Sequence, residues 1–249
     1  MTTAPCLRLD RVSRHFGGLK AVDNVTLDVR MGARHALIGP NGAGKTTLFN
    51  VISGEASATT GTIRFLDADV TKEPPHTRAA RGMARTFQII RLFPSLTVRE
   101  NMLMACQALD PVKYAMLRPL SSCRSLTART DALLDEFGLA NLRHAAARHL
   151  SYGDQRKLEV ALSMAGRPRL LLLDEPMAGL SGGEREAMQR LLSRLDPAMA
   201  VLLIEHDMDV AFGFADTVTV LTHGAVLIQG TTDEVGRDER VQRSYLGTA

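Results

Sequence analysis

The sequence is poor in aromatic residues and carries little net charge, and both shortages limit what the protein binds. Its 249 residues include no tryptophan, and aromatic residues make up only 4% of the chain. Proteins that hold single-stranded nucleic acid stack bases on aromatic rings, so this composition weighs against such a platform. The net charge is only +3, without any run of lysine and arginine. We therefore expect no nucleic acid partner.

Cysteines and long apolar segments are also scarce. The three cysteines, at positions 6, 106 and 123, are odd in number and lack CxxC spacing. They indicate neither a disulfide framework nor a zinc site, and they fit a reducing cytosol. Residues 1–5 show neither the basic start nor the apolar run of a signal peptide. The longest apolar stretches, 170–173 and 198–204, are too short to cross a bilayer, so any membrane role is expected from the aqueous side.

What is present is the pattern of an α/β protein. Hydrophobic residues make up 45% and charged residues 23% of the chain, as in ordinary globular domains. Apolar periodicity predicts β-structure within residues 1–30, strands at 36–38, 61–65, 170–174 and 200–205, and a hairpin at 217–228. It predicts helices at 46–53, within 71–82, at 153–165, 182–195 and 207–214, and over the tail 233–246. Residues 97–145 also read as helical, interrupted by an irregular connection at 108–126. Strands that alternate with helices imply a parallel sheet covered on both faces, with a helical insert at its side.

A glycine-rich segment between the predicted strand 36–38 and the helix 46–53 is the most informative motif. It reads Gly39, Pro40, Asn41, Gly42, Ala43, Gly44, Lys45, Thr46. Its glycines allow backbone N–H groups to turn inward on a polyphosphate, and the following helix adds its positive N-terminal end. Lys45 would reach the β- and γ-phosphates, and the Thr46 hydroxyl would hold Mg²⁺. The alternative is a glycine-rich turn before an ordinary helix, but the complete motif in its strand–loop–helix context predicts a nucleoside triphosphate site.

Two carboxylates follow four consecutive leucines, at Asp174 and Glu175. Such an apolar run suits a central strand buried on both faces, and charge is tolerated only where the strand ends. Ligands bind at that carboxyl-terminal edge in open α/β sheets. Asp174 would then bind the water shell of Mg²⁺, and Glu175 would accept a proton from the water that attacks the γ-phosphate. The alternative is a pair of surface acids in a turn before Pro176.

The segment LSYGDQ, residues 150–155, opens a helix with an apolar face. Ser151 suits the N-cap position, and Gly153 leaves room for a close approach to the helix end. Because a helix N-terminus favours anions, this segment is a second candidate phosphate site, although plain helix capping would also explain Ser151. Two phosphate-directed helix ends in one chain make most sense in two different composite sites.

Together, the phosphate loop, the LSYGDQ segment shortly before LLLLDEP, and His206 after an apolar strand resemble ATP-binding cassette ATPases over nearly the whole chain. Further segments resemble the longer ATPase subunit of branched-chain amino acid importers: FGGLKAV (16–22), ARTFQIIRLFPSLTVRENML (84–103), LLIEHDM and the tail ending at Gly247. The resemblance implies an α/β P-loop NTPase cassette in a single domain over 1–249, with a mainly parallel core sheet. Residues 1–88 and 166–249 would form the ATP-binding core with an N-terminal antiparallel β subdomain, and 89–165 a helical subdomain ending in the signature helix.

The resemblance also implies roles for individual residues. Phe16 would stack on adenine and His206 would contact the γ-phosphate and orient the catalytic water. Gln88 would reach Mg²⁺ and the attacking water from a loop that signals to a membrane subunit. The nucleotide would also contact Val22 and the phosphate loop as far as Thr47, and the signature residues Ser151, Gly153 and Asp154 would bind ATP held by an opposite protomer. Taken alone, Phe16, Gln88 and His206 would be ordinary core, surface and strand-end residues.

Two departures from the family pattern stand out. Tyr152 and Asp154 replace the commonest glycine and glutamine of the signature, while its serine and second glycine remain. Ser181 stands where many cassettes carry an aspartate, which puts one cross-interface contact in doubt but not ATP binding.

The function implied is a peripheral ATPase at the cytoplasmic face of the inner membrane, using ATP and Mg²⁺ to power uptake of branched-chain or other hydrophobic amino acids. Its expected partners are a second ATPase subunit, identical or not, and integral-membrane permease subunits, with a periplasmic or extracellular solute-binding protein acting indirectly. Transport of urea or amides, extraction of lipopolysaccharide, or an ATP-gated clamp outside transport remain alternatives. A P-loop nucleotide kinase is a further one, although it has no use for LSYGDQ.

Overall fold

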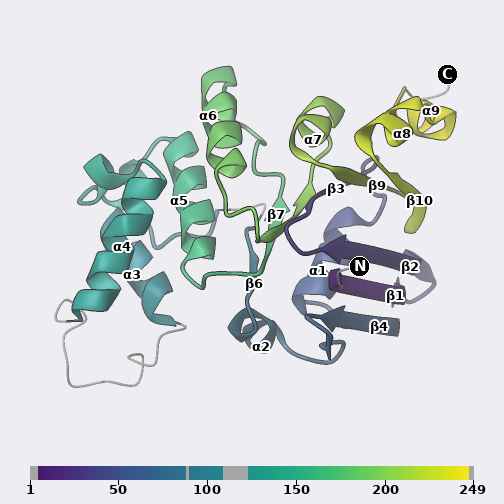
Figure 1. Ribbon diagram of the computed structural model, residues 1–249, viewed down its shortest axis with the longest axis horizontal. Coiled ribbons are helices and arrows are strands. Elements are labelled where there is room, and N and C mark those ends of the chain that lie inside the picture. The colour runs from purple at the N-terminus through teal and green to yellow at the C-terminus, as the bar shows by residue number, and fades with distance from the viewer. Residues whose placement is uncertain (1–4, 88–89, 109–122, 247–249) are drawn as a thin grey trace. The chain divides into compact units, whose positions relative to one another are not determined.

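The computed structural model describes residues 5–87, 90–108 and 123–246 (Figure 1). The chain forms two compact units. The sheet unit comprises residues 1–85, 169–175 and 194–249, and the helical unit comprises residues 86–168 and 176–193. The subdomain boundaries expected at 88/89 and 165/166 stay a prediction. The compact helical unit also includes the segment 176–193.

A six-stranded, mainly parallel sheet organises the sheet unit, which confirms the predicted fold class. Its strand order is β10-β9-β3-β8-β7-β6, and every neighbouring pair is parallel except β9 and β10. The strands are β3 (Arg34–Ile38), β6 (Met83–Arg85), β7 (Leu170–Asp174), β8 (Ala200–Ile204), β9 (Thr217–Thr222) and β10 (Ala225–Gly230). All five residues of β7 and of β8 are buried, as the leucine run predicted for a strand covered on both faces.

The predicted hairpin joins β9 and β10 through His223 and Gly224. Both residues have positive φ, 48° and 79°. Two consecutive left-handed residues match the right-handed twist of the flanking strands, which favours this tight connection. The hairpin closes the sheet with an antiparallel edge strand.

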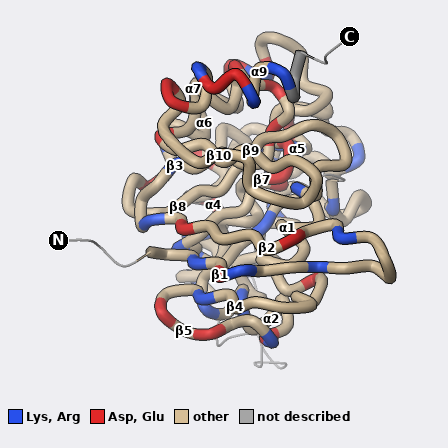
Figure 2. The backbone as a smooth tube through the Cα atoms, turned by 90° about the vertical axis from the view of Figure 1, so that its right-hand side faces the viewer, with Lys and Arg blue, Asp and Glu red and all other residues tan. Residues whose placement is uncertain are grey.

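A second sheet is antiparallel, with the order β2-β1-β4-β5. It consists of β1 (Pro5–Phe16), β2 (Leu19–Arg30), β4 (Thr60–Phe65) and β5 (Ala68–Asp69). Buried apolar residues such as Leu7 and Leu9 alternate along β1 with exposed residues, several of them charged. Charged positions along β1 and β4 are coloured on the tube in Figure 2. Arg8 pairs with Asp28 through two hydrogen bonds of 2.9 and 2.8 Å. This sheet is the predicted N-terminal antiparallel subdomain.

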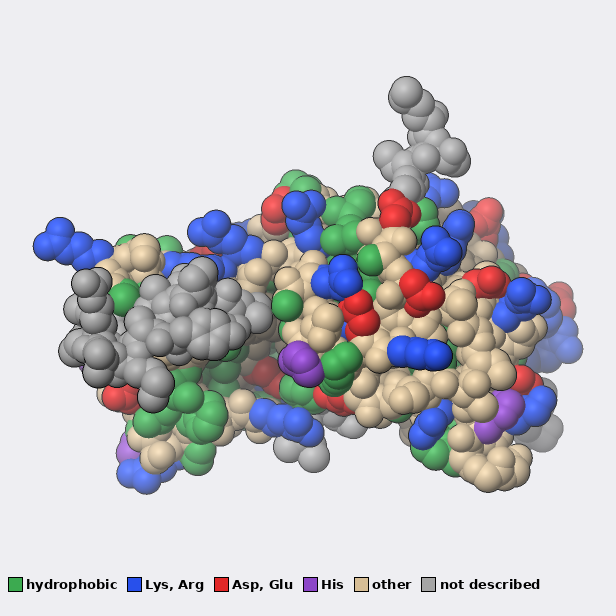
Figure 3. Space-filling view, turned by 90° about the horizontal axis from the view of Figure 1, so that it is seen from below, with side chains coloured by type: hydrophobic (Ala, Val, Ile, Leu, Met, Phe, Trp, Pro, Cys, Tyr) green, Lys and Arg blue, Asp and Glu red, His purple; other side chains and the backbone are tan. Residues whose placement is uncertain are grey.

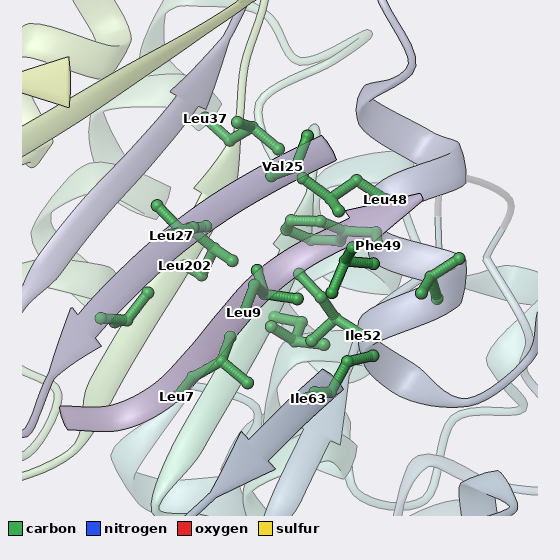
Figure 4. Close-up of a cluster of buried hydrophobic side chains, with 14 of the residues drawn as sticks. Leu7, Leu9, Val25, Leu27, Leu37, Leu48, Phe49, Ile52, Ile63 and Leu202 are labelled. Atoms are coloured by element: carbon green, nitrogen blue, oxygen red, sulfur yellow. The ribbon is translucent and has the colours of Figure 1, made fainter. Parts of the chain in front are cut away.

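Helix α1 (Lys45–Ser53) packs in the core between the two sheets (Figure 4). Its apolar face presents Leu48, Phe49 and Ile52, which are fully buried. Leu27 of the antiparallel sheet and Leu37 of the parallel sheet belong to the same cluster. Truncating a fully buried phenylalanine such as Phe49 typically costs about 3–5 kcal/mol. A helix of this length is only marginally stable by itself, so packing against the core stabilises the helix that follows the phosphate loop.

Buried Arg78 ties down the carboxyl end of α1. It lies on α2 (Pro75–Ala80) and is only 2% exposed. Its guanidinium donates to the carbonyls of Val51 and Ile52 in the last turn of α1, and to those of Thr71 and Glu73. Because the last carbonyls of a helix lack intrahelical partners and carry partial negative charge, a cation there satisfies and stabilises them.

The opposite face of the parallel sheet is covered by three short helices. They are α7 (Met208–Phe214), α8 (Thr232–Arg237) and α9 (Glu239–Leu246), and their apolar residues join Ala36 and Ile38 in a second cluster. The tail was predicted as one helix over 233–246, but Asp238 divides it. Asp238 is extended and its carboxylate accepts from the amide of Arg240, so it ends α8 and begins α9.

The helical unit holds α3 (Val98–Ala108), α4 (Arg124–Glu136), α5 (Tyr152–Met164) and α6 (Gly182–Ser193), with short 3-10 turns at Ala140–Leu142 and Ala147–His149. Asn101 of α3 donates to the carbonyls of Phe93, Leu96 and Thr97 and fixes the chain that enters this helix. The irregular connection predicted at 108–126 lies mostly outside the described residues, and α4 begins at Arg124. Within the described ranges, the helices are all too short or too polar to traverse a bilayer.

Buried His35 makes stability depend on pH. It lies on β3, its Nε2 is 2.8 Å from the Thr219 hydroxyl, and burial lowers its pKa from 6.5 to about 4. Between these values the unfolded chain binds a proton that the folded chain does not, so stability is full above pH 6.5 and falls toward pH 4. We expect protonation of this residue to lower the free energy of unfolding by about 3 kcal/mol between pH 6.5 and pH 4. Denaturant unfolding at several pH values measures it.

The paired variant His35→Leu/Thr219→Val is the control for this pH effect. It removes the titrating ring and the hydroxyl together, so no buried polar atom loses its partner. The stability difference between pH 7 and pH 4 is expected to shrink by that same amount. An unchanged pH dependence in the double variant would show that other groups cause it.

Candidate active site

Three neighbouring strands bring the candidate residues to one edge of the parallel sheet. β3 leads into the phosphate loop, β7 ends at Asp174 and β8 leads to His206. Cα pairing aligns these ends, with Leu37 opposite Ile204 and Ile204 opposite Asp174. Because parallel strands present their carboxyl ends at the same edge, residues far apart in sequence meet there.

The loop from Gly39 to Gly44 requires glycine at particular positions. Gly42 and Gly44 have φ of 79° and 99°, in the left-handed region, and Gly44 is the N-cap of α1. A Cβ at Gly39 would run into the backbone carbonyl of Leu221, and one at Gly44 into that of Ala21. At Gly42 a Cβ would meet open space. The loop therefore packs closely against the neighbouring strands at Gly39 and Gly44, and it faces open space at Gly42.

The amides of this loop form an anion cradle. In the described part of the chain, nothing accepts a hydrogen bond from the N–H groups of Gly42, Gly44, Lys45 or Thr46. Such donors at a helix N-terminus, with the partial positive charge of the helix, match phosphate oxygens. The residues present therefore fit a nucleotide polyphosphate. Exposed Thr46 and half-buried Thr47 stand at the start of the helix, and exposed Asn41 at the mouth of the loop.

Lys45 lies folded over the loop. Its ammonium donates to the carbonyls of Gly39, at 2.7 Å, and Pro40, at 3.0 Å. Burial lowers the pKa of Lys45, and the nearby carboxylates of Glu175 and Asp174 act in the opposite direction. The charge is thus already partly desolvated and surrounded by acceptors, so a phosphate oxygen can replace the carbonyls without a large new desolvation cost.

Asp174 is held at the end of β7 by a basic neighbour. Its side chain is buried, and Arg85 of β6 places Nη2 at 3.2 Å from its Oδ2. Arg85 also donates to Asn50, Ser53 and Glu55. Sequence reasoning missed Arg85, because a three-residue strand shows no periodicity and the contact joins residues 89 positions apart. The oxygen ligands Asp174 and Thr46 have the chemistry that Mg²⁺ prefers.

Glu175 and His206 lie close together, with Nδ1 of His206 at 4.0 Å from Oε1 of Glu175. Glu175 has φ of 48°, a left-handed conformation that is strained for a residue with a side chain. Its amide donates to the carbonyl of Ile204, which holds the turn in place. Strain of this kind persists only where the surroundings enforce it, and it is concentrated at functional sites. His206 is 58% exposed, against 20% for Glu175, so both side chains reach solvent at the same edge.

Phe16 and Val22 differ in what they offer a ligand. The Phe16 ring, at the end of β1, is half exposed, with the Arg14 guanidinium 4.6 Å from its centroid. It is available for stacking. Val22 on β2 is fully buried in the core, so its predicted contact with nucleotide rests on its backbone alone.

The signature segment lies in the helical unit. Ser151 is the N-cap of α5 and accepts a hydrogen bond from the amide of Asp154, as predicted from its position. Tyr152 is exposed, and its ring lies against Gly179, in the space that a side chain at that position would need. Gly153 is buried beside the carboxylate of Glu184, a neighbour that sequence reasoning missed. Gln88 lies outside the described residues. Just before it, the amide of Phe87 donates to Glu159, and Arg156 donates to the carbonyl of Phe87.

Comparison with known families identifies the family to which the chain belongs. The family model described as ABC transporter matches residues 22–178. The chain belongs to the ABC transporter family. It is 39% identical to the high-affinity branched-chain amino acid transport ATP-binding protein LivG of Escherichia coli K12, over 98% of this chain and 99% of LivG. It is 38% identical to BraF of Pseudomonas aeruginosa, with the same coverage of both chains.

Solved structures give the same result. The ADP conformation of MJ1267, an ATP-binding cassette of an ABC transporter, matches with a TM-score of 0.87 and 28% identity, over 99% of this chain and all of MJ1267. As a member of this family, the chain is a nucleotide-binding ATPase subunit of an ABC transporter, which excludes the nucleotide kinase. The predicted resemblance is thereby confirmed. The roles of the individual site residues stay predictions.

Proposed function

We propose that this chain hydrolyses ATP to drive an importer of branched-chain or other hydrophobic amino acids, at the cytoplasmic face of the membrane. The observation that carries the proposal is the joint presence of the phosphate loop, Asp174, Glu175 and His206 at one sheet edge, in a chain alignable with LivG over nearly its full length. LivG and BraF are named for branched-chain amino acid transport, and that substrate class is extended here to this chain.

In the proposed reaction, the loop amides and Lys45 bind the triphosphate. Thr46, Asp174 and Gln88 would hold Mg²⁺, which neutralises charge on the β- and γ-phosphates. Glu175 accepts a proton from the attacking water as the water adds in line to the γ-phosphorus and the bond to ADP breaks. His206 orients that water and contacts the γ-phosphate. Phe16 supports the adenine by stacking.

A second cassette completes the site. Ser151 and Gly153 of one chain would bind the γ-phosphate of ATP held by the other, so that ATP joins the two and hydrolysis releases them. The second cassette is either another copy of this chain or a sister subunit. The Ser151 hydroxyl and the α5 N-terminus have the donor chemistry that this contact needs.

Closure would be transmitted to permease subunits through the loop that contains Gln88. The apolar residues after it include Phe93, which is 54% exposed in the helical unit. An exposed phenylalanine beside a signalling loop suits a contact with a membrane subunit. The solute itself would be chosen by the permease and by a solute-binding protein.

Reconstitution tests the proposed function. The chain is purified with its copurifying membrane subunits, placed in vesicles with the associated solute-binding protein, and supplied with ATP and labelled leucine. ATP-dependent uptake of leucine, isoleucine and valine is the expected result, lost in a Lys45→Met variant. Uptake of urea or short amides in place of these amino acids, or release of lipopolysaccharide, would each contradict it.

A further inference from the structure

The two phosphate donors of the signature segment are already in contact with carboxylates of the same chain. The Ser151 hydroxyl donates to Oδ2 of Asp154 at 2.8 Å, while the amide of Asp154 donates back to Ser151 at 3.1 Å. Asp154 also pairs with Lys157 at 2.9 Å. The carboxylate of Glu184 lies directly against Gly153. The α5 N-terminus thus holds anionic groups supplied by its own chain.

Glu184 reaches Gly153 from the start of α6. One carboxylate oxygen, Oε2, accepts from the amide of Ser181 at 3.0 Å and from its hydroxyl at 2.6 Å, at the start of α6. The other oxygen, Oε1, lies against Gly153, where any Cβ would overlap it. Ser181 is the position where many cassettes carry an aspartate; here a serine stands directly before α6, and the carboxylate stands three residues later.

The charge at this position is firmly maintained. Hydrogen bonds from the hydroxyl and amide of Ser181 lower the pKa of Glu184, while the negative charge of Asp154 opposes them. The group is therefore ionised at neutral pH. A second anion brought to the helix end beside Gly153 must overcome repulsion from the carboxylate that already lies there.

We propose that Glu184 is a positioning residue that occupies the phosphate position on Gly153 in the free chain and must withdraw before the γ-phosphate of an opposing ATP docks there. This inference rests on the proposed pairing of cassettes through Ser151 and Gly153. Glu184 thereby sets the ATP concentration at which two cassettes close. When Oε1 withdraws from Gly153, Oε2 keeps its two bonds to Ser181 at the start of α6.

The variant Glu184→Gln separates the effect of the negative charge beside Gly153 from the effect of the bonds between Glu184 and Ser181. Its amide oxygen still accepts from Ser181, but the negative charge on Gly153 is gone. The matched control is Glu234→Gln on α8, where Glu234 makes the same two contacts with Thr231, accepting from its amide at 2.8 Å and from its hydroxyl at 3.1 Å. Both variants are expected to lose similar, small amounts of thermal stability.

The test measures ATP-driven assembly by sedimentation, in a Glu175→Gln background, with the chain alone and with its sister cassette. Glu184→Gln is expected to lower the ATP concentration for half-maximal assembly roughly three- to tenfold, and Glu234→Gln to leave it unchanged. Equal midpoints in parent, Glu184→Gln and Glu234→Gln, or a higher midpoint in Glu184→Gln alone, would overturn the proposal.

Amide hydrogen exchange in the nucleotide-free chain tests the contact itself. The Gly153 amide is expected to exchange several-fold faster in Glu184→Gln, because the negative charge that lies against Gly153 is removed. An unchanged rate would refute the contact even if assembly proceeds normally. If the parent fails to assemble with ATP both alone and with its sister cassette, the proposed pairing of cassettes is wrong. This result is distinguishable from a failure of the Glu184 proposal, because it is seen in the chain that still carries Glu184.

Discussion

Glu175→Gln is expected to lower the rate of ATP hydrolysis by about 10²–10⁴-fold, the usual cost of losing a positioned general base. The substitution keeps the shape of the side chain but removes the carboxylate that we propose accepts the proton from water. ATP binding is expected to persist, because the phosphate loop and Lys45 are untouched. Single-turnover hydrolysis and equilibrium binding of a fluorescent ATP analogue measure the two effects separately.

Glu205→Gln is the matched control for this prediction. The Glu205 carboxylate also lies 4.0 Å from Nδ1 of His206, but it is 1% exposed, whereas Glu175 is 20% exposed. Solvent access decides which carboxylate meets the attacking water, so Glu205→Gln is expected to retain hydrolysis within about tenfold. If Glu205→Gln abolished turnover and Glu175→Gln did not, the assignment of the base would be wrong.

Lys45→Met is expected to weaken ATP binding by about 10²-fold, which corresponds to about 3 kcal/mol, the upper range for a hydrogen bond to a charged group. Lys45 is buried, and burial lowers its pKa, so the folded chain bears a desolvation cost for its charge. Methionine fills a similar volume without that cost. We therefore expect thermal stability to stay level or rise while affinity falls. Isothermal titration and thermal unfolding on the same samples measure both.

Lys20→Met provides the comparison for Lys45→Met. Lys20 is exposed and pairs with Asp23 at 3.1 Å on the surface of the sheet unit. Removing an exposed pair of this kind changes stability little, and ATP affinity is expected to stay unchanged. A loss of affinity in Lys45→Met that accompanied unfolding, or equal losses in both variants, would contradict a direct phosphate contact.

The elements that the sequence predicted well are those with strong local patterns. The leucine run of β7 lies at residues 170–174 as predicted, and α1 differs from its prediction by one residue. Both are specified by apolar runs and glycine signals that are visible without tertiary information. Short strands such as β5 and β6, with two and three residues, carry no such pattern and were missed.

The parts of the site that escaped prediction depend on contacts between distant residues. The pairing of Arg85 with Asp174 follows from strand order, and the contact of Glu184 with Gly153 follows from the packing of α5 and α6. Neither residue belongs to a local motif. On the face drawn in Figure 3, the basic and acidic side chains of the described residues are interspersed. Sequence motifs identified the phosphate chemistry, and the fold was needed to find what holds its residues in position.

The central claim, that two chains complete each ATP site, is tested most directly by the dependence of specific ATPase activity on protein concentration. Activity per chain is expected to rise with concentration, or on addition of a sister cassette, and Ser151→Ala is expected to lower that activity without lowering ATP affinity of the single chain. Constant activity per chain down to concentrations where sedimentation shows only monomer, with Ser151→Ala as active as the parent, would contradict the account.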